Sequence, residues 1–243
     1  MPDSLSSLKR VNMIIYVLIA ACITFLIHEQ LMRIDLPINN FILEGEYQHI
    51  DREQINLITS RYIKGNFFKI NLKKIRKAFI KLPWVREVSL RRKWPDKLII
   101  TIDEHKVIAR WREIGLINDR GEIFNAASED NLPLFFGANE FAKEITEKYN
   151  QINKILEKEL MQVSIIRLSN RLSWEIITDN HIKIALGKKD ILYKLEQFIK
   201  NYQFVLAELK STIEYVDLRY KNGFSVRNKN NIKNFNKKIK IIL

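Results

Sequence analysis

The chain has little of the residues that build covalently or metal-stabilised folds. Its 243 residues include one cysteine, Cys22, together with four histidines, seven glycines and five prolines. A single cysteine excludes an intramolecular disulfide framework and a zinc site built on cysteines. Because 47% of the residues are hydrophobic, we expect packing to stabilise a folded protein.

The sequence also lacks the motifs of common enzyme classes. No Gly-rich phosphate loop or nucleophile elbow is present, and His28-Glu29 lacks the second histidine of a zinc-peptidase helix. Ser6 and Lys9 have Ser-x-x-Lys spacing without the companion motifs. Glu104-His105 is interpreted as a surface or interdomain polar pair rather than an acid/base couple. We therefore expect no enzymatic activity, cofactor, metal site or small-molecule substrate.

Acidic residues are fewer than basic ones, 28 against 41, which leaves a formal net charge of +13. This excess permits an anionic partner but says nothing about the fold. The sequence contains no zinc-finger spacing, recognisable helix-turn-helix or aromatic-rich RNA-binding strand. We expect no nucleic-acid partner.

One stretch is unlike a globular domain. Residues 11–27, VNMIIYVLIAACITFLI, contain no charged side chain. At about 1.5 Å per residue this run would span about 26 Å as a helix, near the thickness of a hydrocarbon core. Lys9 and Arg10 precede it and the next basic residue is Arg33. The positive-inside rule predicts a cytoplasmic tail at 1–10, a transmembrane helix at 11–30 and the remainder outside the cytoplasm.

Two alternatives to an uncleaved anchor apply to this segment. A cleavable signal peptide needs a small-x-small site, which HEQLMRID after Ile27 does not offer. Residues 19–22, Ile-Ala-Ala-Cys, resemble a bacterial lipoprotein processing box with Cys22 as the lipid attachment point. The apolar run continues as ITFLI after that cysteine, which favours the anchor, with Cys22 an inert residue in lipid.

The region after the anchor has the pattern strand, helix, helix, strand, strand. FILEG at 41–45 fits a strand, and Asp51 and Asn71 are in capping positions before two amphipathic segments. Pro83 is expected to end the second helix. The apolar positions with helical spacing are Ile55, Ile58 and Tyr62 in the first helix and Leu72, Ile75, Phe79 and Leu82 in the second.

Residues 86–94 and 97–104 alternate as a hairpin around a turn at 94–97. Its cations are interpreted as the solvated face of a half-buried sheet. The four tryptophans lie in or beside such patterns, so we expect core packing for all of them: Trp84, Trp94, Trp111 and Trp174.

The rest of the chain is rich in strand patterns. Asp119-Arg120-Gly121 fits a turn between two short strands, and helical spacing recurs near 139–160 and 188–209. The expected strands lie at 110–111, 116–117, 122–124, 163–169, 172–178, 181–186 and 213–220.

Several segments, in this order behind one N-terminal anchor, resemble the FtsQ/DivIB family of bacterial cell-division proteins. They are residues 65–111, which contain PWV and RKWP, followed by GLINDRGEIF (115–124), NLPLFFG (131–137) and VDLRYKNGFSV (216–226).

The resemblance implies an α+β fold: a single N-terminal transmembrane helix, a POTRA module (β-α-α-β-β) at 36–105, then a mainly antiparallel β domain with flanking helices at 106–227. It implies a single-pass type II inner-membrane scaffold at the division septum. Such a scaffold links early and late division proteins and helps control septal peptidoglycan synthesis. The implied partners are periplasmic segments of FtsB and FtsL, with other membrane proteins of the divisome.

When the family's partner-binding positions are matched to this sequence, the resemblance places the partner-binding edge near the end of the β domain, where a partner would add a strand. Tyr220 and Phe224 are the expected anchors, and Gly223 permits a turn or close backbone approach. The alternative is a terminal hairpin with both aromatics in the core. The implied partner-binding residues are Arg219, Tyr220, Asn222, Gly223, Phe224 and Val226.

The POTRA hairpin is a second candidate contact surface by resemblance, with Arg86, Val88, Arg91 and Arg92. For any single arginine, the solvated-face interpretation is preferred. A POTRA-containing envelope assembly or transport component is the alternative function, but no train of ten-residue alternating strands follows.

The C-terminus departs from the family pattern. Asn228 stands where family members often carry an aromatic residue, which puts the far end of the partner contact in doubt. The basic tail at 228–243 is not covered by the resemblance and has five lysines and no acid from residue 229 onward. It is expected either to be disordered or to contact an anionic membrane surface or the partner.

Overall fold

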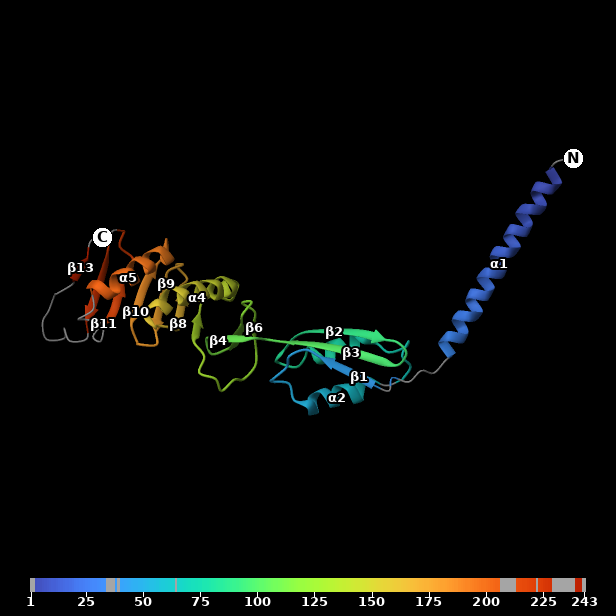
Figure 1. The fold of residues 1–243 in the computed structure, drawn as a ribbon, viewed down its shortest axis with the longest axis horizontal. Helices are drawn as coiled ribbons and strands as arrows, with labels where there is room; N and C mark the ends of the chain where they lie inside the picture. Colours follow the sequence, from blue (N-terminus) through green and yellow to red (C-terminus); the bar gives the residue numbers. More distant parts are fainter. Residues whose placement is uncertain are drawn as a thin grey trace. The chain divides into compact units, whose positions relative to one another are not determined.

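The computed structural model describes residues 3–33, 38, 40–63, 65–205, 213–221, 223–228 and 239–241. The chain divides into two compact units, Met1–Glu104 and His105–Leu243 (Figure 1). The predicted class is confirmed: one N-terminal apolar helix, a POTRA module and a β-rich domain with helices.

The first helix, α1, runs from Asp3 to Arg33. Its segment Asn12–Gln30 has a mean hydropathy of 1.8 and is long and apolar enough to cross a membrane. None of that segment is buried against the rest of the protein, so its apolar side chains have no protein core to pack into. Cys22 is exposed within it.

The POTRA module follows as β1 (Asn40–Glu44), α2 (Arg52–Tyr62), α3 (Leu72–Phe79), β2 (Val85–Lys93) and β3 (Lys97–Glu104). Its sheet has the order β1-β3-β2, with β1 parallel and β2 antiparallel to β3. Helices α2 and α3, together with β2, form the long connection that parallel pairing of β1 and β3 requires. The predicted order of elements is confirmed.

Both predicted helix caps form. The Asp51 side chain accepts a hydrogen bond from the backbone N–H of Glu53 at 3.1 Å, and Asn71 accepts one from Lys74 at 3.1 Å. Each satisfies a backbone donor that has no partner within the helix. The second helix ends at Phe79, four residues before Pro83, through a tighter turn in which the Leu82 N–H donates to the Phe79 carbonyl.

The module's core contains most of the predicted apolar positions of both helices and of the hairpin, but Tyr62 of the first helix is 39% exposed. Ile75, Phe79, Leu98 and Ile100 are fully buried there. Trp94 is the exception among the tryptophans, because its side chain is 76% exposed at the hairpin turn and the prediction of core packing is wrong for it. The alternation that placed it on the inner face ends with β2 at Lys93.

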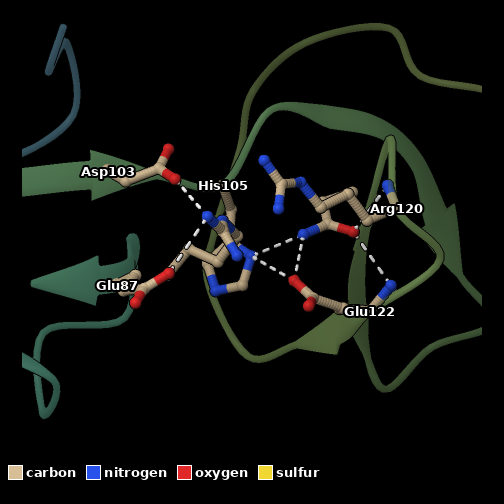
Figure 2. Close-up of polar contacts among 7 residues, drawn as sticks. Glu87, Asp103, His105, Arg120 and Glu122 are labelled. Atoms are coloured by element: carbon tan, nitrogen blue, oxygen red, sulfur yellow. Dashed lines mark hydrogen bonds and ion pairs between the residues drawn. The ribbon is translucent and has the colours of Figure 1, made fainter.

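Glu104 and His105 do not form a polar pair at the surface. The Glu104 carboxylate is buried and accepts hydrogen bonds from the backbone N–H groups of Gln48, His49 and Ile50 at 2.9–3.2 Å. In the second unit, a ring nitrogen of His105 lies 2.9 Å from the Asn118 side-chain amide, which also donates to Glu122 (Figure 2). Each residue therefore organises its own unit.

The second unit contains one ten-stranded sheet, with the order β13-β12-β11-β10-β9-β8-β7-β4-β5-β6. Its strands are β4 (Val107–Trp111), β5 (Gly115–Asn118), β6 (Ile123–Phe124), β7 (Leu134–Phe136), β8 (Val163–Leu168), β9 (Trp174–Thr178), β10 (Lys183–Gly187), β11 (Ile213–Asp217), β12 (Phe224–Asn228) and β13 (Ile239–Ile241). The predicted meander β8-β9-β10 and the turn at 119–121 are present. The sheet is more mixed than expected, because β4–β7, β7–β8 and β10–β11 pair in parallel.

Two α-helices of this unit pack on each other and against the sheet (Figure 1). Helix α4 (Ala142–Leu156), flanked by the 3₁₀ turns η1 (Asn139–Phe141) and η2 (Glu157–Glu159), contacts β8, and α5 (Ile191–Val205) contacts β10. Ile145, Leu195 and Phe198 are fully buried in the shared core. Helix α5 also provides the crossover between the parallel strands β10 and β11.

Replacing Glu104 by alanine should destabilise the POTRA module. The change would leave three backbone donors without their acceptor, which we expect to cost about 2–4 kcal/mol in the free energy of unfolding. Urea denaturation monitored by Trp84 fluorescence would report it, because Trp84 stacks on His49 with ring centroids 3.7 Å apart. The control is Glu46→Ala at an exposed site. A loss no greater than in the control would contradict the role assigned to Glu104.

Candidate partner-binding edge

Strands β11 and β12 form an antiparallel pair near one end of the large sheet. The register places Val216 opposite Val226 and Asp217 opposite Ser225. On its other side β11 pairs in parallel with β10, so the terminal pair is joined to the body of the sheet. The candidate residues Arg219, Tyr220 and Gly223 lie in the connection between the two strands, and Phe224 and Val226 lie in β12. Asn222 lies outside the described residues.

The outer side of β12 is occupied over part of its length. Strand β13 pairs antiparallel with it, with Phe224 opposite Ile241, Ser225 opposite Lys240 and Val226 opposite Ile239. Arg227 and Asn228 have no counterpart in this register. The chain's own C-terminal segment therefore lies where the resemblance places a partner strand.

Arg219 is held against the sheet by Asp217. Its guanidinium donates to both carboxylate oxygens, at 2.8 and 2.6 Å, and its backbone N–H donates to one of them at 3.0 Å. Burial alone would raise the pKa of Asp217, but these hydrogen bonds outweigh it and the pKa is lowered. The same bonds raise the pKa of Arg219. Arg219 thus fixes the turn into the β11–β12 connection.

Burial and the nearby Asp217 carboxylate also raise the pKa of Tyr215, whose hydroxyl lies 3.4 Å from that carboxylate. On the β12 side, Arg227 lies over the Tyr215 ring at 5.2 Å and 3.6 Å from Glu214. The two strands are therefore joined by charged and aromatic contacts on their more exposed face.

Tyr220 is the exposed aromatic of the candidate set, with 47% of its surface accessible. It borders a depression of about 230 Å³ between the connection and the first turns of α5. Gly223 adopts a φ of +140°, which favours glycine at this position. Among the described residues, the lining combines two tyrosines and two lysines and includes no acidic residue: Tyr193, Lys194, Gln197, Leu218, Tyr220, Lys221, Gly223 and Phe224.

The side chains of Phe224 and Val226, unlike that of Tyr220, lie in the core. Both are buried, and the Phe224 ring contacts Phe198 edge to face, with centroids 5.3 Å apart. The Phe224 side chain therefore belongs to the core and is not available as a surface anchor. The alternative in which the aromatic residues of this hairpin lie in the core therefore applies to Phe224. It does not apply to Tyr220, whose ring is exposed. What β12 can offer a partner at these two positions is its backbone.

The four candidate residues of the POTRA hairpin also differ in whether they are buried or exposed. Val88 is buried in the core. Arg86 is mostly buried and pairs with Asp103 and Glu87 (Figure 2), and Arg92 donates to the carbonyls of Phe67 and Ile70 at 2.9 Å. Arg91 and Arg92 are both exposed, and Arg91 lies 3.3 Å from Glu44. The solvated-face interpretation therefore suits Arg91, whereas Arg92 is exposed but also bound to backbone carbonyls, and Arg86 is mostly buried.

Sequence reasoning missed the contribution of α5 and the strand at 239–241. Tyr193 and Lys194 lie in α5, whose apolar positions were predicted from their helical spacing. That spacing does not indicate which loop lies beside the polar side of the helix. Ile239-Lys240-Ile241 has the alternation of a short strand, a signal obscured by the surrounding lysines and asparagines. Within the part of the chain that the structure describes, no group of three His, Cys, Asp or Glu residues could hold a metal ion.

Comparison with known proteins gives a consistent result. The FtsQ-type POTRA domain matches residues 36–105, and the C-terminal domain of cell division protein FtsQ/DivIB matches residues 109–219. The cell division protein FtsQ of Nitrosospira multiformis is 37% identical over 183 residues, which cover 75% of this chain and 78% of that protein. The chain belongs to the FtsQ family. The FtsQ of Coxiella burnetii is 33% identical over 198 residues, covering 80% and 82% of the two chains.

The FtsQ domain match ends at Arg219. The family assignment therefore covers the body of the sheet, together with the Asp217–Arg219 contact that anchors its terminal pair. Tyr220, β12 and β13 lie beyond this match, so what is said of them comes from the structure alone.

Replacing Asp217 by asparagine should weaken the β11–β12 pair in a pH-dependent way. Because the folded pKa of Asp217 lies below its ordinary value of 3.8, its contribution is complete above that value and is lost as the pH falls through the folded pKa. We expect a cost of about 1–3 kcal/mol at pH 7 that shrinks below about pH 4.

Native-state amide exchange of β11 at several pH values would measure this cost. The control is Glu214→Gln, an exposed carboxylate on the same strand, which should change the free energy of opening by less than about 0.5 kcal/mol. A cost for Asp217→Asn that does not change with pH would show that the charge is not what stabilises the turn.

Proposed function

We propose that this chain is a non-catalytic, single-pass scaffold of the bacterial division machinery, anchored in the inner membrane by α1. In this proposal the short N-terminal tail is cytoplasmic, and the POTRA module and β domain are periplasmic. The support is the apolar segment Asn12–Gln30, the basic pair Lys9 and Arg10 before it, and the membership of the FtsQ family.

The partner in this proposal is an extended segment of FtsB, in complex with FtsL, that adds a strand to the end of the large sheet. The observation that carries the proposal is the position of β12. One side of this strand is fixed to the sheet through β11, while the other side is paired over three residues with a short segment of the same chain. Backbone groups on such a side supply affinity for an added strand.

Specificity would come from the neighbouring connection. Tyr220 offers a large, amphipathic side chain beside a depression whose lining includes Lys194 and Lys221. Aromatic residues with a polar end are common anchors in protein interfaces. Acting through this edge, the scaffold would link early and late division proteins at the septum and help control septal peptidoglycan synthesis.

Arg91 on the POTRA hairpin is proposed as a separate contact for other membrane proteins of the divisome. Arg91 and Arg92 are both exposed, but the Arg92 guanidinium donates to backbone carbonyls, whereas Arg91 contacts only the Glu44 side chain among the contacts described for it. Because exposed ion pairs contribute little to stability, its contact with Glu44 could be exchanged for a partner at small cost.

Replacing Tyr220 by alanine should weaken binding of the FtsB/FtsL periplasmic segments at least about tenfold while leaving the fold intact, since an exposed interface aromatic is lost. Pull-down and titration with the segments from the same organism would measure it. Tyr62→Ala is the matched control, because Tyr62 is a tyrosine of comparable exposure in the POTRA module. Phe224→Glu would be unsuitable, since it would place a charge in the core.

Equal binding by wild type and Tyr220→Ala would remove the β12 region from the proposed interface. A loss in Tyr62→Ala with none in Tyr220→Ala would move the interface to the POTRA module. Absence of binding by folded wild type would contradict the scaffold proposal for this pair of partners.

A further inference from the structure

The two backbone sides of β12 are both in use. Strand β11 pairs with one side over most of the length of β12, and β13 pairs with the other side from Phe224 to Val226. A strand in a sheet has one neighbour on each side, because its backbone N–H and C=O groups point in only two in-plane directions. A partner strand and β13 therefore cannot pair with the same residues of β12 at the same time.

The pairing of β13 has the pattern of a matched strand. Ile241 and Ile239 stand opposite Phe224 and Val226, the two buried positions of β12, and Lys240 stands opposite the less buried Ser225. The register therefore pairs the two isoleucines of this segment with the two buried positions of β12. A shift by one residue would instead pair Lys240 with a buried position. Isoleucine also favours extended structure.

We propose that residues 239–241 occupy, in the unbound protein, the strand position on β12 that a partner would take, so that partner binding requires their displacement. This inference rests on the proposed function for the identity of the partner. The occupancy itself rests on the register of β13. The C-terminal segment then acts as an internal competitor that lowers the affinity of the edge for any added strand.

The extent of β13 explains how a partner could replace it. The internal strand covers three of the five residues of β12 and leaves Arg227 and Asn228 without a counterpart on that side. Among the described residues, the Asn228 side-chain oxygen is buried without a hydrogen-bond partner. A partner strand that runs the full length of β12 could form further backbone pairs at these positions and bring a donor to that oxygen.

The connection in the sequence makes the competition intramolecular. Ten positions, 229–238, separate β12 from β13. A segment that belongs to the same chain competes at an effective concentration that does not depend on dilution, so even a weak strand can be well occupied. If β13 is paired in about nine molecules of ten, its removal should tighten partner binding about tenfold.

The test uses the full-length chain in nanodiscs and a variant truncated after residue 238. Amide exchange at Phe224–Val226 should be faster in the truncated variant, and a synthetic peptide of residues 237–243 should bind that variant at least about tenfold more tightly than wild type. Ile239→Pro should behave like the truncation, because proline in β13 disturbs the pairing without shortening the chain. Lys240→Gln is the control, since it removes one positive charge and keeps the strand.

Unchanged exchange at Phe224–Val226 after truncation, or equal peptide binding by wild type and the truncated variant, would overturn the occupancy. The FtsB segment should also bind the truncated variant and Ile239→Pro more tightly than wild type or Lys240→Gln. Equal affinities for that segment would overturn the competition. If the segment binds none of the variants while the peptide distinguishes them, the partner assignment fails and the internal strand stands.

Discussion

The structure of the second unit depends on how the backbone hydrogen-bonding groups at the two ends of its open sheet are satisfied. The ten-stranded sheet does not close on itself, so its terminal strands would present unpaired N–H and C=O groups. One end is the two-residue strand β6, too short to template a new strand. The other end is the three-residue strand β13, which covers part of the five-residue strand β12. The proposed function uses this asymmetry, because in it a partner strand would pair with β12.

The burial of Phe224 and Val226 determines what kind of recognition this side permits. Their side chains are committed to the core with Phe198, so they fix β12 in place and set its register against β11. In the proposed interface, a partner strand would therefore pair with a β12 whose Phe224 and Val226 side chains are held in the core. The exposed side chains beside it belong to the connection and to α5, as Tyr220 and Tyr193 do. The proposal therefore assigns affinity and specificity to different segments.

Local signals allowed much of the fold to be predicted from the sequence. Asp51 and Asn71 lie within a few residues of the N–H groups they cap, and the alternation in β2 and β3 is continuous through a short turn. Strand β7 was missed because Leu134–Phe136 is three residues long and pairs in parallel with distant strands. Tyr220 was proposed as a binding residue from the family resemblance, whereas β13 depends on a long-range register that the composition of the segment does not reveal. The strands β7 and β13 were not predicted because their pairing joins segments far apart in the sequence, and a local pattern does not encode such pairing.

Arginines show why net charge was a poor guide to binding surfaces. Arg92 donates to the carbonyls of Phe67 and Ile70, Arg110 to those of Ser128 and Asp130, and Arg112 to that of Gly137. A guanidinium can satisfy several carbonyls at once, so each of these residues ties a loop to a neighbouring strand. In a chain with one cysteine, such contacts hold the loops where disulfides cannot. Part of the basic charge is therefore bound to the protein's own backbone carbonyls, whereas other cations, such as Arg91 and Lys221, are exposed.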